Sequence, residues 1–374
     1  MLMQKPFIDF YTEIGFAPTG QQEGQVQKHW ENRTNLYRKL GLHPGLFKGA
    51  SVLEIGPGSG ENTIDLLNRG IRSLKLVDGV PAVLESLKAR VKTQIPITYE
   101  LYDASMSPPS LEVFDIVICE GVIPLQLDPI VFFQNVSKSV APGGIVLVTT
   151  NDAVSALSEI LRRISAHLLF QVNGSNTQSL VAFFQEDFQS LTNMSRTPSN
   201  WVLDSIQNPW IGKTFSIQEA LTALGNDFRP ISMTPSLHSD LDWYKEINNN
   251  SSETAKWISS YQQNLHLLID FQVNEQSPVD SVSNLRLLEL CSGIFLQMQG
   301  LVSGELQDAR QLIMESLKSI VEECKQLNFR TKQSLISYLE FLKYGDAQSL
   351  KDFRLFWGRG QQYLCFERSV TVLI

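Results

Sequence analysis

The sequence predicts an α/β protein built on a doubly wound, mostly parallel sheet of seven strands. Two observations predict this fold class. Between residues 51 and 150, short apolar runs of strand length alternate with segments of helical periodicity, which is typical of parallel sheets with helices on both faces. The run FDIVICE (114–120) is nearly continuous in apolar residues, as expected for a strand covered on both faces.

The expected elements follow one another in a regular order. Strands are expected at 51–55, 74–78, 97–103, 114–120 and 145–150, and helices at 61–70, 81–91 and 128–140. Gly70 is placed to end the first of these helices and Pro81 to begin the second. The segment APGG (141–144) is expected to form the turn into the fifth strand.

The alternation breaks after residue 150, which indicates helical insertions. Helices are expected at 153–170 and 215–225, and helical patterns continue through 255–345. FRPISMTP (228–235) is expected to form a sixth strand at a sheet edge, because Pro230 cannot donate a ladder hydrogen bond. QYLCFERSVTV (362–372) is expected to be the last strand.

These elements suggest a division of the chain into six segments. They are a helical cap (1–45), a core (46–150), a first helical insertion (151–212), a return to the core with a helix and the sixth strand (213–238), a second helical insertion (239–355) and the last strand (356–374).

Composition and charge exclude several classes of protein. The chain has 374 residues, of which 43% are hydrophobic and 19% charged, a balance of globular rather than disordered proteins. The net charge of −8 and the lack of any dense Lys/Arg run predict no nucleic-acid partner. No segment has about 18 uncharged apolar residues and the N-terminus is unlike a signal peptide, so we expect a soluble, cytoplasmic protein without a membrane partner.

The four cysteines show neither metal-ligand nor redox spacing. We expect them to be small buried hydrophobic residues in a reducing compartment: Cys119, Cys291, Cys324 and Cys365.

A glycine-rich segment, VLEIGPGSGENTIDLL (52–67), joins the first strand to the first helix. Gly56, Gly58 and Gly60 allow a sharp turn and a close approach of backbone to a ligand. The spacing departs from the dinucleotide pattern G-x-G-x-x-G, because Glu61 occupies the position of the third glycine. A carboxylate at Glu54, just before the turn, would disfavour a pyrophosphate but could pair with a cationic ligand.

Two further acids end neighbouring strands. Asp78 ends the second strand, where a carboxylate can accept hydrogen bonds from the 2′- and 3′-hydroxyls of a ribose. Asp103 ends the third strand, where an adenine amino group would lie.

Taken in order, these motifs resemble the class I, Rossmann-like S-adenosylmethionine-dependent methyltransferases. The glycine segment resembles the first motif of that family, and LKLVDG contains the counterpart of its ribose-binding acid. ELYDAS resembles the adenine contact, FDIVICEG the fourth motif beside the methionine end of the cofactor, and APGGIVLV the turn into the fifth strand. The resemblance covers residues 50–150 and, more loosely, 228–235 and 362–369, and it implies an antiparallel last strand.

The resemblance implies S-adenosyl-L-methionine as cofactor and S-adenosyl-L-homocysteine as product. The cofactor-binding residues that it implies are Glu54, Gly56, Gly58, Gly60, Asp78, Asp103, Ala104, Glu120 and Gly121. We expect transfer of the methyl group to a small-molecule acceptor, at a hydroxyl oxygen. The family's Asn-Pro-Pro-Tyr motif is replaced by CEGVIP, which argues against methylation of nucleic-acid bases or glutamine side chains.

Other functions remain open from the sequence. The acceptor could be a peptide, a protein or a carrier-bound molecule, or the chain could bind adenosylmethionine without catalysis. A nucleotide-dependent oxidoreductase is disfavoured by Glu54 and Glu61.

For the acceptor side, we expect His238 to act as a general base or orienting group and Arg359 to hold a polar acceptor. If the last strand pairs beside the sixth, these residues meet at one pocket next to the methyl group. A reading of HSDLD as metal ligands, with Asp240 and Asp242, is weaker, and we expect no metal. FAPTGQ (16–21) is expected to close over the cofactor. The insertions are expected to form a lid that shapes the acceptor pocket, and the second one could also mediate a homodimer.

Overall fold

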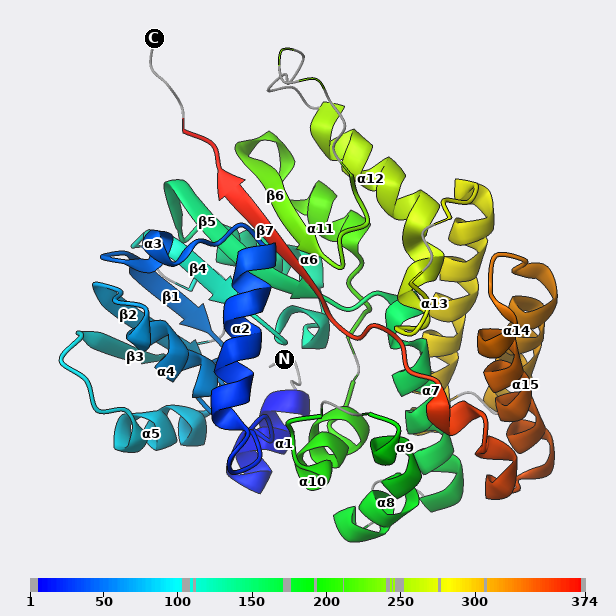
Figure 1. The fold of residues 1–374 in the computed structure, drawn as a ribbon. Coiled ribbons are helices and arrows are strands. Elements are labelled where there is room, and N and C mark those ends of the chain that lie inside the picture. Colours follow the sequence, from blue (N-terminus) through cyan, green and yellow to red (C-terminus); the bar gives the residue numbers. More distant parts are fainter. Residues whose placement is uncertain are drawn as a thin grey trace.

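The computed structural model describes residues 6–102, 108–109, 112–170, 176–191, 194–210, 212–239, 243, 245, 252–274, 277–305 and 308–370. Within these residues, seven strands form one sheet in the order β3-β2-β1-β4-β5-β7-β6 (Figure 1). The strands are β1 (Ser51–Ile55), β2 (Ser73–Asp78), β3 (Ile97–Leu101), β4 (Phe114–Cys119), β5 (Val140–Thr150), β6 (Phe228–Thr234) and β7 (Gln362–Arg368). Neighbours from β3 to β5 are parallel, and β7 is antiparallel to both β5 and β6. The predicted fold class is confirmed, with β6 at the edge and an antiparallel last strand.

The predicted turn at 141–144 was wrong. The strand β5 already pairs with β4 at Val140, and the pairing then shifts until Ile145 lies opposite Ile116. The residues APGG therefore form an irregularity inside the strand. Gly144 is crowded there, because a β-carbon would lie 2.8 Å from the carbonyl oxygen of Ala141.

Helices cover both faces of the sheet. One face carries α2 (Val26–Lys39), α3 (Pro44–Phe47), α4 (Glu61–Asn68) and α5 (Pro81–Arg90). The other carries α6 (Pro129–Ser137), α7 (Ala153–Phe170) and α11 (Ile217–Ala223). Each helix buries an apolar stripe against alternating strand residues, so the two periodicities in the sequence meet in two cores, one on each face.

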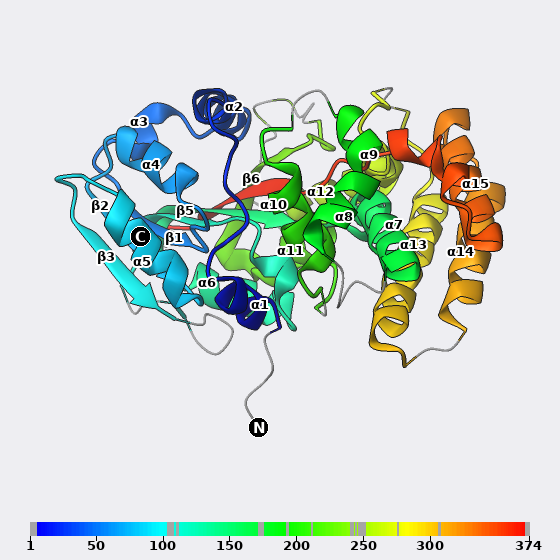
Figure 2. The ribbon, with the colours of Figure 1, turned by 90° about the horizontal axis from the view of Figure 1, so that it is seen from below.

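The remaining helices extend this core to one side of the sheet. They are α1 (Pro6–Ile14), α8 (Thr177–Phe183), α9 (Gln185–Gln189), α10 (Pro198–Val202), α12 (Ser252–Asn264), α13 (Ser281–Ser303), α14 (Ala309–Glu323) and α15 (Phe329–Tyr344), with short helical turns at 123–125, 203–207, 225–227, 265–268, 347–350 and 353–355. From below, α7, α13, α14 and α15 stand side by side, beyond the end of the sheet (Figure 2). Their buried side chains join those of the sheet in one continuous cluster.

The helix α13 is the only described helix whose length and composition would allow it to cross a membrane. It packs between α7 and α14, and it buries Leu287, Cys291, Ile294 and Phe295 there. This packing accounts for part of its apolar character, because 33% of its most apolar window is buried. All four cysteines are free and buried, as predicted.

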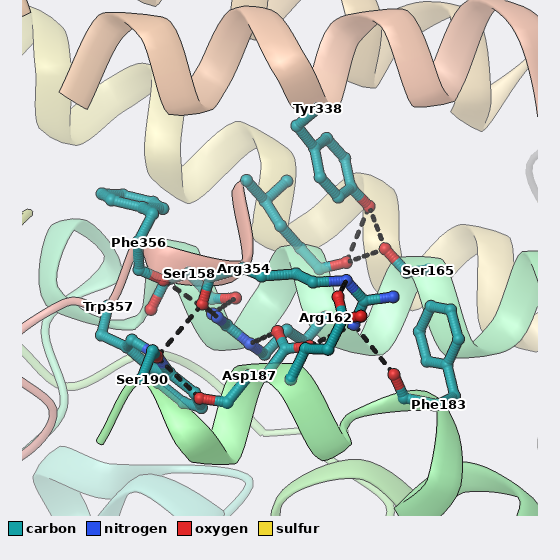
Figure 3. Close-up of polar contacts among 12 residues, drawn as sticks. Ser158, Arg162, Ser165, Phe183, Asp187, Ser190, Tyr338, Arg354, Phe356 and Trp357 are labelled. Atoms are coloured by element: carbon teal, nitrogen blue, oxygen red, sulfur yellow. Dashed lines mark hydrogen bonds and ion pairs between the residues drawn. The ribbon is translucent and has the colours of Figure 1, made fainter. Parts of the chain in front are cut away.

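A buried ion network attaches the segment before β7 to α7 (Figure 3). Arg162, which is 0% exposed, donates from Nε to Asp187 on α9 at 2.8 Å and from Nη1 to the carbonyl of Phe356 at 2.9 Å. Its guanidinium lies 3.6 Å from the centre of the Trp357 ring. Arg354 also bonds Asp187. These contacts fix the path by which the chain returns to the sheet.

Candidate functional site

A cavity of about 490 Å³, here called the central cavity, lies at the carboxyl ends of β1, β2 and β4. The strand order reverses between β1 and β4, and open α/β sheets bind ligands at such a switch point. The floor is formed by strand ends and the glycine loop. The walls come from α1, α2, the segment 16–22 and the start of β7.

The glycine loop borders this cavity through Gly56 and Gly58. Gly58 has φ +54°, and a β-carbon there would lie 2.6 Å from Oγ1 of Thr19 in the covering segment. Gly60 is different, because it does not line the cavity. A β-carbon at Gly60 would lie 2.2 Å from Leu87 on α5, so this glycine serves the packing of α4 against α5.

Asp78 lines the cavity at the end of β2. Its Oδ1 accepts a hydrogen bond from the backbone N–H of Val80 at 2.8 Å. Burial raises the pKa of the carboxyl to about 6. The side chain is placed at a strand end where a ligand's hydroxyl groups can reach it.

Glu120 and Gly121 line the cavity at the end of β4. Glu120 forms a two-pronged ion pair with Arg33 of α2, at 2.6 Å from Nη1 and 2.8 Å from Nη2. Gly121 donates its N–H to Oγ1 of Thr149 at 2.7 Å, which holds the β4 end against β5. Arg33 was not among the predicted site residues. The sequence pattern that could have identified it is a positive charge on the helix face that also carries Trp30 and Tyr37.

The arrangement fits a zwitterionic nucleoside. The glycine loop leaves space that β-carbons would fill, and Asp78 faces this space as a hydrogen-bond acceptor. Glu120 supplies a negative charge and Arg33 a positive charge. Nε of Arg33 is buried without a hydrogen-bond partner in the structure.

Comparison with protein families supports one interpretation of this site. Residues 29–189 match the family model described as a methyltransferase domain. The match supports the resemblance to the class I S-adenosylmethionine-dependent methyltransferases over this part of the chain. S-adenosylmethionine is its cofactor. A comparison with curated protein sequences gave no match to the chain.

Solved structures of methyltransferases are similar only at low identity. The N-methyltransferase NodS of Bradyrhizobium japonicum WM9, in complex with S-adenosylhomocysteine, is 18% identical with a TM-score of 0.33, over 41% of this chain and 76% of that one. The magnesium protoporphyrin IX methyltransferase of Synechocystis PCC 6803 is 15% identical with a TM-score of 0.32, over 40% of this chain and 78% of that one. The complex of the Haloferax volcanii Trm112 activator with a methyltransferase is 14% identical with a TM-score of 0.39, over 68% of this chain and 92% of that one. TM-scores this low carry no argument about the acceptor.

Glu54 does not line the methyltransferase's central cavity, contrary to the expected contact with a cationic ligand. It is 3% exposed beneath the glycine loop, and its Oε2 accepts a hydrogen bond from Thr63 of α4 at 2.6 Å. Burial raises the pKa of this carboxyl to about 7. Glu54 therefore ties the first strand to the first helix.

Asp103 and Ala104 lie outside the described residues. Tyr102, directly before them, lines the central cavity.

His238 and Arg359 were expected to flank the pocket beside the methyl group, but neither lines the central cavity. His238 is hydrogen-bonded through Nδ1 to Ser260 Oγ at 3.0 Å and stacks on Trp257. Arg359 donates from Nε to the carbonyl of Leu267 at 2.7 Å. The strands β6 and β7 do pair, but the segments beyond them turn toward the second insertion rather than toward the cofactor.

No set of three or more potential metal ligands gathers among the residues that the structure describes. Asp240 and Asp242, of the metal reading, lie outside them.

The covering segment 16–22 connects two walls of the cavity. Thr19 Oγ1 accepts a hydrogen bond from the N–H of Ser59 at 2.9 Å, and Gln21 pairs by a β-bridge with Arg196 of the first insertion. The hydroxyl of Tyr11 on α1 donates to Asp204. The N-terminal region is thereby attached to both the glycine loop and the first insertion.

His29 on α2 lines the central cavity. Its Nε2 is 2.8 Å from Oδ1 of Asn62. The Nδ2 of Asn62 donates in turn to Oε2 of Glu120, at 3.4 Å. No sequence signal joins these residues, because they come from three separate elements.

Proposed function

We propose that this methyltransferase acts on a small molecule and that the accepting atom is a hydroxyl oxygen. The observation that carries the proposal is the covering of the central cavity by α1 and the segment 16–22, which bond the glycine loop on one side and the first insertion on the other. A macromolecular side chain would need an open approach. A small molecule can be enclosed.

The residues around the cavity fit distinct parts of the cofactor. Asp78 is suited to the ribose hydroxyls, and the loop at Gly56 and Gly58 to the methionine portion. Arg33 and Glu120 can meet its carboxylate and ammonium groups. When bound, the cofactor supplies a methyl group already activated on a sulfonium, so orientation can provide much of the rate enhancement.

We propose His29 as the group that accepts the hydroxyl proton. Because Asn62 donates its amide to Glu120, its Oδ1 faces His29. Nε2 of the imidazole then carries the hydrogen, and Nδ1 is left as the basic atom. In the transfer, the oxygen–methyl bond forms as the sulfur–methyl bond breaks, and the proton passes from oxygen to Nδ1.

Other titratable groups at the cavity are less suited to this role. Glu120 is bound to Arg33, and Asp204 to Arg196 and Tyr11. The pKa of Tyr11 is raised well above its usual value by burial and by Asp204. Burial also raises the pKa of Tyr363 to about 12.

The helical insertions contribute differently to the acceptor side. We propose that the first insertion shapes it through Arg196 and Asp204. No described residue of the second insertion lines the central cavity, so the role proposed for it is in the neighbouring groove described below. A homodimer through the second insertion also stays a prediction, which light scattering at several protein concentrations would test.

The function is tested in two steps. Calorimetric titration should give one site for S-adenosylmethionine and for S-adenosylhomocysteine. Incubation with methyl-labelled cofactor and a metabolite extract should then yield a labelled small molecule whose label resists amine-selective derivatisation. Label found only in the macromolecular fraction would contradict the small-molecule proposal, and absence of cofactor binding would contradict the catalytic one.

The role of His29 is tested by His29→Gln, with His43→Gln as a matched control just before the short helix α3. Loss of a general base typically lowers turnover by about 10²–10⁴-fold. We expect that loss in His29→Gln with nearly unchanged cofactor affinity, and no loss in the control. Unchanged turnover in His29→Gln would leave orientation alone as the mechanism.

A further inference from the structure

A second hollow, here called the side groove, opens beside the central cavity and has a volume of about 950 Å³. The two share three wall residues: Leu36 on α2, and Gln361 and Tyr363 at the start of β7. Both hollows therefore border these three residues, here called their junction.

The walls of the side groove are largely apolar and aromatic. Trp201, Phe271 and Trp357 contribute rings, and Met233, Leu237 and Leu267 contribute aliphatic surface. Trp357 is held in place, because its Nε1 donates to Ser190 Oγ at 2.8 Å and its ring stacks on the buried guanidinium of Arg162 (Figure 3). Rigid aromatic walls of this kind suit a planar apolar body.

One cation on the groove wall has no ion-pair partner. Arg359 donates to the carbonyls of Leu267 and Val273, and among the described residues no carboxylate lies within 4.0 Å of its guanidinium. Asp270 interacts electrostatically with Arg359, but only from beyond this distance. The carboxylate oxygens of Asp270 accept hydrogen bonds from the N–H of Gln272 and from Oγ1 of Thr331. An arginine held by neutral carbonyls keeps its full charge and can bind an anion with its remaining N–H groups.

The other charges on the groove do not neutralise Arg359. Lys39 of α2 adds a second positive charge at the rim. Glu159 is the acidic residue of the lining, and its carboxylate lies 4.0 Å from Arg163 of the same helix. Burial raises the pKa of Glu159.

From these observations we propose that the side groove is the acceptor-binding site, and that its ligand is an aromatic or polycyclic small molecule whose carboxylate, sulfonate or phosphate is bound by Arg359. The inference rests on the proposed function and adds the class of acceptor to it. Arg359 lies two residues before Gln361, so their Cα atoms are at most about 7 Å apart. One small molecule can therefore reach from Arg359 to the junction with the central cavity.

A matched pair of fluorescent probes tests the site without knowledge of the substrate. 8-Anilinonaphthalene-1-sulfonate has an aromatic body with an anionic group, and N-phenyl-1-naphthylamine has the same body without it. We expect the folded protein with bound S-adenosylhomocysteine to bind the sulfonate at one saturable site. Arg359→Gln should weaken the sulfonate by about tenfold or more, as expected for a hydrogen bond to a charged group, and leave the neutral probe nearly unchanged.

Two control variants make the outcome decisive. Lys351→Gln removes an exposed positive charge that lines neither hollow, and should change neither probe's affinity. Arg359→Lys keeps the charge but loses the planar fork, so it should retain part of the sulfonate's affinity. Equal weakening of both probes, or a Lys variant as weak as the Gln variant, would show that Arg359 only supports the loop and would overturn the proposal.

Failure of this inference differs from failure of the function. If S-adenosylhomocysteine binds but the probes do not discriminate at Arg359, the acceptor class is wrong and the methyltransferase remains. If the methylated product isolated from extract is neutral at pH 7, the anionic class is also overturned. Loss of cofactor binding in the wild-type protein would instead refute the proposed function.

Discussion

At the scale of single residues, the positions around the glycine loop have different structural roles. Gly58 makes room for the covering segment, and Gly60 makes room for α5. Glu54 and Asp78 are both acidic strand residues, yet Glu54 is hydrogen-bonded within the core and Asp78 faces the cavity. The same kind of side chain thus supports folding at one position and binding at the other.

Replacing Gly58 should separate binding from folding. In Gly58→Val, the new β-carbon would lie 2.6 Å from Thr19 Oγ1, so the branched side chain displaces the covering segment. We expect at least about tenfold weaker binding of S-adenosylhomocysteine by calorimetry. Gly70→Val is the matched control, because Gly70 also has positive φ but no atom within 4 Å. Equal affinity in both variants would contradict the role of Gly58.

The raised pKa of Asp78 predicts a pH dependence of cofactor binding. In the role proposed for it, its carboxylate accepts hydrogen bonds from the ribose, and protonation below about pH 6 removes part of that capacity. Affinity for S-adenosylhomocysteine should therefore fall as the pH is lowered from about 7 to about 5. Asp78→Asn should be weaker at neutral pH by about 1.5–3 kcal/mol and show a flatter profile. A wild-type affinity that does not change over this range would argue against Asp78 as the ribose acid.

The raised pKa of Glu54 predicts an effect on stability instead. Between the unfolded pKa, about 4.3, and the folded value of about 7, the folded state holds a proton that the unfolded state has lost. The free energy of unfolding should therefore fall as the pH rises through this window, and should stay lowered above it. Glu54→Gln keeps an acceptor for Thr63 and should remove this component, on the order of 3 kcal/mol. Urea unfolding on either side of the window measures the difference, and equal changes in wild type and variant would contradict it.

At the scale of elements, the N-terminal helices complete a site that the sheet begins. The hydroxyl of Tyr11 joins the helix α1 to the first insertion. It donates a hydrogen bond to Asp204 and accepts one from Nδ2 of Asn208 at 3.0 Å. The adjoining helix α2 supplies Arg33 and His29 to the opposite wall. Neither helix belongs to the strand–helix alternation, yet both border the central cavity.

Loss of the Tyr11 hydroxyl should loosen this cover. Tyr11→Phe removes two hydrogen bonds, each worth about 0.5–1.5 kcal/mol. We expect release of S-adenosylhomocysteine to become about tenfold faster in stopped-flow fluorescence, with little change in the unfolding transition. Tyr344→Phe, at a side chain that is 68% exposed on α15, is the control. Unchanged release would show that α1 does not retain the ligand.

At the scale of the whole molecule, the insertions and the sheet form one body. Buried side chains from β4 and β5 continue without interruption into α7, α13 and α15. The network of Arg162, Asp187 and Arg354 joins both insertions just before β7, the strand that brings Gln361 and Tyr363 to the junction of the two hollows. Stability of the insertions is therefore coupled to the geometry of the acceptor side.

Removing Arg162 should test that coupling. Arg162→Met leaves three backbone carbonyls and Asp187 with fewer donors in the core, so we expect a loss of about 3 kcal/mol or more in urea unfolding. The matched control, Arg286→Met, breaks exposed pairs with Glu289 and Glu323 and should change the urea unfolding transition little. Similar effects of the two substitutions would contradict a structural role for the network.

Local patterns in the sequence were sufficient to predict the sheet and the order of its elements. Strand and helix periodicities are local, and the glycine loop and Asp78 each lie where a strand ends, so their position beside the central cavity could also be predicted. For Glu54, adjacency to the loop in sequence did not reveal which way the side chain faces, and its carboxylate bonds Thr63. The APGG turn was misread because a glycine pair also suits a bulge within a strand.

The residues proposed for the acceptor side could not be predicted from such local patterns. Arg33, Asn62 and Glu120 meet at one wall from two helices and a strand end, and no spacing in the chain encodes such a meeting. His238 and Arg359 were expected at the cofactor because their strands pair, but pairing fixes backbones and not the loops beyond them. Those loops follow the packing of the second insertion, where Arg359 bonds the carbonyl of Leu267 and His238 bonds Ser260. Long-range packing of this kind depends on the complete fold, and it placed Arg359 in the side groove.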